Sequence, residues 1–77
     1  MIDAKTFGDA AKGIIEMLED PVMNEEHEEL VSITIQKDEQ NDGWVAFATV
    51  YRPADGKTKS FKYAIYFGEN HWVADGF

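Results

Sequence analysis

The sequence contains no cysteine among its 77 residues, and this absence excludes several ways of holding a small protein together. Without thiols the chain has no disulfide framework, no thiol nucleophile and no cysteine-based zinc site. A domain this short buries only about 60–65% of the surface of its unfolded chain, so its hydrophobic core is thin. Hydrophobic packing, helped by self-association, is the remaining source of stability, and a reducing compartment fits best.

Long hydrophobic runs are also missing. Charged residues interrupt the first 18 positions, where an export signal needs a continuous apolar stretch. The longest apolar runs, 44–48 and 63–67, fall far short of the roughly 18 residues that a membrane span requires. We therefore expect a single α+β domain, residues 1–77, in the cytoplasm and with no membrane partner.

Motifs for catalysis and for cofactor binding are absent as well. Two histidines are the only candidate bases, and neither serine lies in the Gly-x-Ser-x-Gly pattern that presents a nucleophile. The six glycines are dispersed, so none forms a phosphate-binding loop before a helix. Residues 25–29 offer several potential metal ligands, but neighbouring side chains diverge and no known ligand spacing occurs. We expect no enzyme activity, no cofactor and no metal site.

One α-helix is predicted near the N-terminus. Thr6, followed three residues later by Asp9, resembles a capping box, although Asp3 would begin the helix one turn earlier. Pro21 marks the end of the segment. Two glycines lower its helix propensity, so packing must hold it. The apolar residues recur at the spacing of one helical face: Phe7, Ala10, Ala11, Ile14, Ile15 and Leu18.

After Leu30 the apolar residues follow a period of two, which is typical of strands. Val31, Ile33 and Ile35 alternate with polar residues, and this alternation predicts a strand with one buried face. Three further strands are expected, over residues 44–52, about 57–67 and 71–74.

The second and third strands are expected to form a hairpin. Residues 53–56, Pro-Ala-Asp-Gly, combine a residue of fixed φ with a glycine that tolerates positive φ, so they predict the turn. With those four residues as the loop, small side chains on one strand face large ones on the other. The predicted pairs are Arg52–Lys57, Ala48–Phe61, Ala46–Tyr63 and Trp44–Ile65.

These elements predict an α+β fold in which the N-terminal helix packs on one face of a four-stranded antiparallel β-meander. A single helix cannot cover both faces of such a sheet, so the other face is a candidate interface. That face carries three aromatic residues and a lysine: Phe47, Tyr51, Lys62 and Tyr66.

Charge is distributed unevenly along the chain, whose net charge is −8. Residues 1–42 contain 12 acids against 3 bases, whereas residues 43–77 contain 3 acids against 4 bases. We expect the acids between positions 16 and 42 to border one common edge of the fold and to bind a partner protein. These candidate protein-binding residues are Glu16, Glu19, Asp20, Glu25, Glu26, Glu28, Glu29, Asp38, Glu39 and Asp42.

The acidity has two interpretations, a solvated surface that keeps the protein soluble or a surface that docks on a basic groove. Acids at the end of a helix oppose its macrodipole, so local stability does not explain them. In size and charge alone, and not in any motif, the chain is similar to phage-encoded inhibitors of host defence nucleases of the anti-CRISPR and anti-restriction type. We predict a protein-binding inhibitor that acts as a nucleic-acid mimic and occupies a basic, nucleic-acid-handling site of its partner.

Two alternatives stay open, and both use the uncovered sheet face. The first is an assembly or adaptor module that forms a homodimer or binds a partner there, because aromatic residues are enriched in protein interfaces. The second is a weak binder of single-stranded nucleic acid, in which bases stack on the aromatic rings. The net charge of −8 repels phosphate, so direct nucleic-acid binding is not expected.

Overall fold

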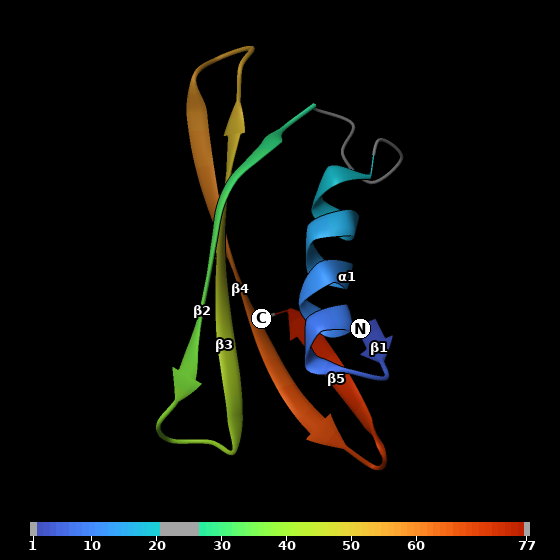
Figure 1. The fold of residues 1–77 in the computed structure, drawn as a ribbon. Coiled ribbons are helices and arrows are strands. Elements are labelled where there is room, and N and C mark those ends of the chain that lie inside the picture. The colour runs from blue at the N-terminus through green and yellow to red at the C-terminus, as the bar shows by residue number, and fades with distance from the viewer. Residues whose placement is uncertain (1, 21–26, 77) are drawn as a thin grey trace.

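One helix and a five-stranded antiparallel sheet make up the described part of the chain, residues 2–20 and 27–76 of a computed structural model (Figure 1). The strands lie in the order β1-β5-β4-β3-β2. The α+β class is therefore confirmed, but four strands were too few. The elements in chain order are β1 (Ile2–Ala4), α1 (Phe7–Glu19), β2 (Glu29–Asp38), β3 (Gly43–Arg52), β4 (Lys57–Gly68) and β5 (His71–Gly76).

The additional strand is β1, at the edge of the sheet next to β5. Ile2 pairs with Ala74, and Ala4 pairs with Trp72. Three residues are too few to display an alternating pattern, so the sequence alone did not predict this strand. β1 packs closely against Gly13 of α1, where an added Cβ atom would lie only 2.8 Å from Cγ2 of Ile2. The glycine inside α1 thus lets β1 lie directly against the helix.

The predicted start of α1 is confirmed. The hydroxyl of Thr6 accepts a hydrogen bond from the backbone N–H of Asp9 at 3.1 Å, and the helix begins at the next residue, Phe7. At the other end, the backbone of Asp20 is extended and its N–H donates to the carbonyl of Met17 at 3.4 Å. Pro21, which was expected to end the helix, lies outside the described residues.

The hairpin of β3 and β4 has the register that its turn predicted. Each of the four expected pairs, from Arg52–Lys57 to Trp44–Ile65, is present. The pairing of β4 with β5 begins at Tyr63–Gly76, and after Ile65 β4 leaves β3 and continues as the partner of β5 alone.

A β-bulge changes the expected pattern of β2. Leu30 pairs with Val50 and Ser32 pairs with Thr49, so Val31 is an additional residue without a partner in β3. Val31 is 57% exposed, and its expected place on the buried face was wrong. Leu30 takes that place and packs against the core.

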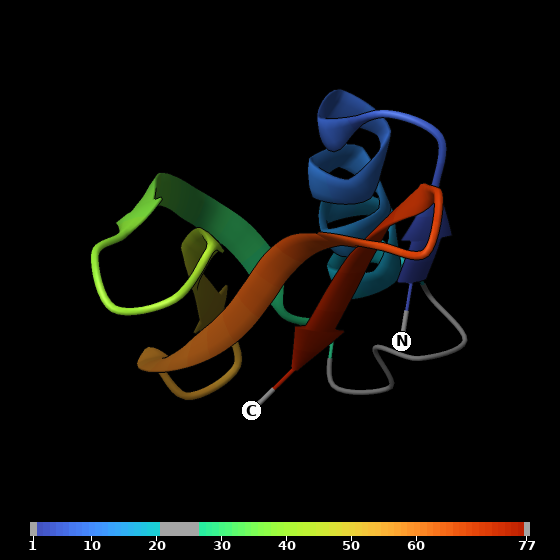
Figure 2. The ribbon, with the colours of Figure 1, turned by 90° about the horizontal axis from the view of Figure 1, so that it is seen from below.

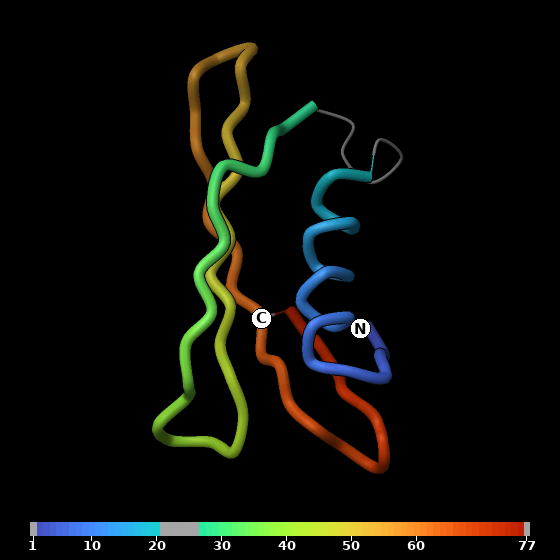
Figure 3. Tube along the Cα trace, viewed as in Figure 1, coloured from blue at the N-terminus to red at the C-terminus, as the bar shows by residue number. Residues whose placement is uncertain are grey.

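The core lies between α1 and the concave face of the sheet. Seen from below, the edge strands β1 and β2 lie on either side of α1 (Figure 2), and both contact the helix. The β3–β4 hairpin runs beyond the end of α1 (Figure 3). No helix in residues 2–20 and 27–76 is long and apolar enough to cross a membrane. The buried core residues are Ala10, Ile14, Ala46, Ala48, Tyr63, Ile65 and Ala74.

Candidate protein-binding surfaces

The predicted acidic residues that the structure describes lie at two ends of the molecule. Glu19 at the end of α1 and Glu29 at the start of β2 lie at one end, and the loop of residues 39–42 lies at the other (Figure 1). The ten residues of β2 separate them, a length of about 30 Å for an extended strand. The described acids therefore form two separate groups, one at each end of this edge strand, rather than one continuous patch. Glu25 and Glu26 lie outside the described residues.

At the first end, three acids form the set that we call the helix-exit acids: Glu16, Glu19 and Glu29. All three are exposed, and none makes an ion pair with another described residue. The last turn of α1 contains no basic residue, so its two acids meet the negative end of the helix dipole without compensation. Asp20, which follows them, is half-buried. This end therefore carries uncompensated negative charge at the surface.

Glu28 has a different role from its predicted one. Its carboxylate Oε2 lies 3.5 Å from Nη2 of Arg52 and 3.5 Å from Nζ of Lys59, and its side chain is only 14% exposed. Arg52 also donates to the carboxylate of Asp55 at 3.0 Å. Glu28 thus ties the start of β2 to the β3–β4 hairpin, and it is not available for docking. No local pattern indicates these contacts, because the partners are distant along the chain.

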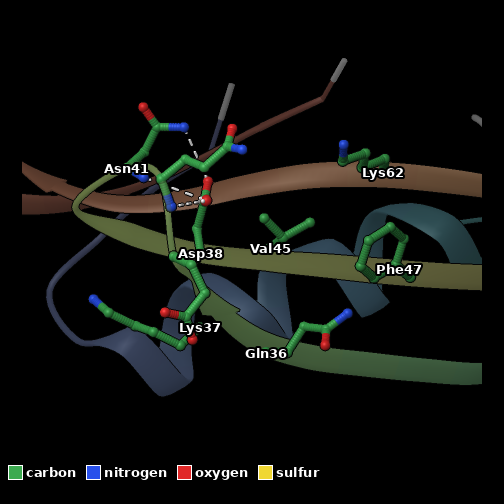
Figure 4. Close-up of a pocket in the computed structure, with 9 residues that line it drawn as sticks. Gln36, Lys37, Asp38, Asn41, Val45, Phe47 and Lys62 are labelled. Atoms are coloured by element: carbon green, nitrogen blue, oxygen red, sulfur yellow. Dashed lines mark hydrogen bonds between the residues drawn. The ribbon is translucent and has the colours of Figure 1, made fainter.

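At the second end, Asp38 organises the loop between β2 and β3. Its Oδ1 accepts hydrogen bonds from the backbone N–H groups of Gln40 and Asn41, at 3.0 and 3.3 Å, and its Oδ2 accepts one from the side-chain amide of Asn41 at 3.1 Å (Figure 4). These bonds, the one from the Asn41 side chain above all, lower the pKa of Asp38 below its ordinary 3.8, and the charge of Lys62 lowers it further. The loop is therefore held by a carboxylate that stays ionised.

Two further acids of this loop, Glu39 and Asp42, are exposed and make no ion pair within the described residues. We call them the loop acids. Between the loop and the sheet face lies a hollow of about 360 Å³, lined by Asp38, Phe47 and Lys62 among others (Figure 4). It opens toward the face of the sheet that α1 does not cover.

On that uncovered face, Phe47 is 39% exposed and Tyr51 is 36% exposed. Phe47 pairs with Lys62 on the neighbouring strand, and Nζ of Lys62 lies 5.9 Å from the centre of the ring. Tyr51 lies near the end of β3 and Tyr66, half-buried, near the end of β4. The structure thus brings Phe47 and Lys62 together but leaves the two tyrosines apart. Hydroxyl side chains between them interrupt any continuous aromatic platform.

A groove that the sequence did not indicate lies at the end of the sheet where β4 leaves β3. We call it the aromatic groove. It has a volume of about 420 Å³ and opens between the β2–β3 loop and the end of β4. Its floor includes Gly43, which is buried and whose added Cβ would lie 2.8 Å from the carbonyl oxygen of Ile65. The residues that define it are Asp38, Asp42, Gly43, Trp44, Tyr66 and Phe67.

In the part of the chain that the structure describes, no group of three or more His, Cys, Asp or Glu side chains comes together that could hold a metal ion. No protein-family model matches the chain, and no curated protein and no solved structure matches it either. A function must therefore be inferred from the surfaces of the molecule.

Proposed function

We propose that the protein is a non-enzymatic inhibitor that binds a partner protein at a basic, nucleic-acid-handling surface. The observation that carries this proposal is a set of five acids that are exposed and make no ion pair within the described residues. Uncompensated charge of one sign steers association with a surface of the opposite sign and selects against acidic partners. These five are the helix-exit acids and the loop acids: Glu16, Glu19, Glu29, Glu39 and Asp42.

The separation of the two acidic ends favours an extended basic surface as the partner site. The described part of the molecule measures 41 × 25 × 17 Å, and its two acidic ends are separated by the length of β2. Duplex DNA carries one phosphate charge per about 1.7 Å of axis, so a protein channel that holds it is basic over a comparable length. A mimic that spans such a channel would exclude the nucleic acid. Inhibitors of the anti-CRISPR or anti-restriction type are the class to which this proposal points.

Competition with nucleic acid tests the proposal. The protein, immobilised by a tag, is incubated with lysate of its source cells, and captured proteins are identified by mass spectrometry. We expect capture at about 0.1 M salt and release toward 1 M, because the Debye length falls from about 10 Å to about 3 Å. Nucleic-acid fragments should displace the protein from the purified partner. A partner that stays bound at 1 M salt and in the presence of nucleic acid would contradict the proposal.

A second candidate function is assembly through the uncovered sheet face, and the exposure of Phe47 and Tyr51 on that face favours it. Under this alternative the protein forms a homodimer in which these rings are buried. Sedimentation equilibrium should then show a dimer that the double variant Phe47→Ser with Tyr51→Ser converts to a monomer. A wild-type monomer at all concentrations would remove this candidate.

A further inference from the structure

We infer that the aromatic groove receives an arginine side chain of the partner protein. This inference rests on the proposed function, because it names the place on the acidic surface where one basic side chain is bound rather than merely attracted. The groove was absent from the sequence-based prediction, which considered the acids and the sheet face separately.

The shape of the groove follows from the strand pairing. Trp44–Ile65 is the last pair between β3 and β4, and beyond it β4 turns away with β5. On the other side, the pair Asp38–Gly43 closes the β2–β3 loop. The opening between them, about 420 Å³, lies within the range of about 300–1,000 Å³ that is usual for ligand sites.

The apolar wall of the groove is exposed yet firmly supported. Phe67 is 59% exposed, the highest exposure of any large apolar residue in residues 2–20 and 27–76. Behind it stands a chain of edge-to-face ring contacts: Phe67 with Trp72 at 5.5 Å, Trp72 with Phe7 at 5.3 Å, and Phe7 with Trp44 at 5.3 Å. These contacts anchor both Phe67 and Trp44, and Phe67 remains accessible to a ligand. A pre-organised aromatic wall loses little conformational entropy when a ligand binds.

The rim of the groove is acidic. Asp42 is exposed and makes no ion pair within the described residues. Asp38 is held by three hydrogen bonds that lower its pKa, so it stays negatively charged at neutral pH. Two carboxylates beside aromatic rings exclude an acidic ligand and favour a cationic one.

Arginine fits this combination better than lysine. Its guanidinium is planar, stacks on aromatic faces and binds a carboxylate through two parallel hydrogen bonds. Nζ of Lys37 already lies 5.2 Å from the centre of the Trp44 ring, so the exposed ring of Phe67 is the aromatic surface left for the arginine. The groove therefore offers an arginine an aromatic surface for its planar head and a carboxylate at the rim.

Nuclear magnetic resonance with a minimal probe tests the inference. Acetyl-Gly-Arg-Gly-amide is titrated into ¹⁵N-labelled protein, and the lysine and citrulline analogues serve as cationic and neutral comparisons. We expect chemical-shift changes at the Trp44 indole and at the backbone amides of Asp42, Gly43 and Phe67. The changes should be largest with arginine, smaller with lysine and absent with citrulline, which keeps the shape of arginine but not its charge.

Two pairs of matched variants locate the site. Asp42→Asn and Glu16→Gln each remove one exposed negative charge, and only Asp42→Asn should weaken binding of the arginine probe, by about five-fold. Phe67→Ser and Phe47→Ser each remove one exposed ring, on opposite faces of the sheet, and only Phe67→Ser should weaken it. The amide spectrum of each variant, unchanged away from the substitution, confirms that the fold is intact.

The possible failures of the two proposals are distinguishable. If Asp42→Asn and Glu16→Gln weaken binding of the arginine probe equally, or if the shift changes spread over all exposed acids, the groove is not the arginine site. The proposed function would still stand in that case, provided that partner binding is sensitive to salt. Absence of any shift with the arginine probe would also overturn the groove. Partner binding that ignores salt and nucleic acid would overturn the proposed function itself.

Discussion

The two halves of the β3–β4 hairpin consist of the same paired strands but differ in what covers them. In the half beneath α1, Ala46, Tyr63 and Ile65 are buried. The outer half of the hairpin runs past the end of α1 (Figure 1). Phe61, nearer the turn, lies on the same face of the sheet as Tyr63 and Ile65 but is 36% exposed. Farther along the hairpin, Val50 on β3 is only 2% exposed, whereas residues 57–62 of β4 are all exposed. The comparison shows that burial in the outer half is confined to β3, although the strand ladder continues on β4.

Polar contacts also support the outer half of the hairpin. Glu28 links Arg52 and Lys59 there, while Arg52 also binds Asp55. Ion pairs near the surface contribute less stability than a buried side chain does. Most of the free energy of folding should therefore come from the half that α1 covers.

The largest expected effect belongs to the covered half. Ile14→Ala should lower the free energy of unfolding by about 2–5 kcal/mol, because Ile14 is fully buried beneath the sheet and the substitution leaves a cavity. Phe61→Ala is the matched change in the outer half, and it should cost less than about 2 kcal/mol because part of the ring is already in water. Chemical denaturation measures both. Equal losses would contradict the comparison.

Two glycine substitutions compare a closely packed position with an open one, and smaller effects are expected. Gly43→Ala should destabilise the protein by about 1–3 kcal/mol, because the new Cβ would lie 2.8 Å from a backbone oxygen of Ile65 that cannot move away freely. Gly8→Ala is the control: its nearest atom, in Thr6, is 4.0 Å away, and alanine favours the helix by up to about 1 kcal/mol. Thermal unfolding should shift in opposite directions for the two variants, and a stabilised Gly43→Ala protein would refute the close approach of β3 and β4.

The ion pairs of the outer half should contribute about 1 kcal/mol. Glu28→Gln removes the charge that faces Arg52 and Lys59 but keeps the size of the side chain. We expect a small loss of stability, together with faster amide hydrogen exchange in the outer half of the hairpin and unchanged exchange beneath α1. Exchange that accelerates equally in both halves would show that the hairpin does not behave as two regions.

The smallest expected effect concerns the loop of Asp38. Its pKa lies below 3.8 in the folded protein, so its stabilising hydrogen bonds are complete at neutral pH and are lost only as the pH falls through that lowered value. The amide signals of Gln40 and Asn41 should therefore stay constant from pH 7 to about pH 4 and move below it. A midpoint above 3.8 would contradict the hydrogen-bonded geometry of the loop.

Local patterns predicted the parts of the fold that depend on local chemistry. The spacing of apolar residues and the cap at Thr6 predicted α1, and the turn at residues 53–56 predicted the register of β3 and β4. The bulge at Val31 and the short strand β1 depend on tertiary contacts, so no local pattern contained them.

The candidate site was predicted in composition but not in arrangement. Five of the predicted acids that the structure describes are exposed, but β2 separates them into two groups, and Glu28 contacts the hairpin instead. The aromatic groove exists because β4 diverges from β3 after Ile65 and stays paired with β5. The sequence of either strand alone does not indicate this divergence.

The central claim is that exposed acids, and not the sheet face, bind the partner. Its most direct test is the association rate constant of two variants with the captured partner. The first carries Glu16→Lys, Glu19→Lys and Glu29→Lys, and Glu28 is left unchanged because it pairs with Arg52. Exposed substitutions of this kind seldom change stability by more than about 0.5 kcal/mol each, so the fold should persist.

The second variant carries Phe47→Ser and Tyr51→Ser on the uncovered sheet face. We predict that the lysine variant associates at least ten-fold more slowly at low salt, that this difference shrinks as salt rises, and that the serine variant associates at close to the wild-type rate. Normal association of the lysine variant together with loss of binding by the serine variant would contradict the account and would identify the sheet face as the binding surface.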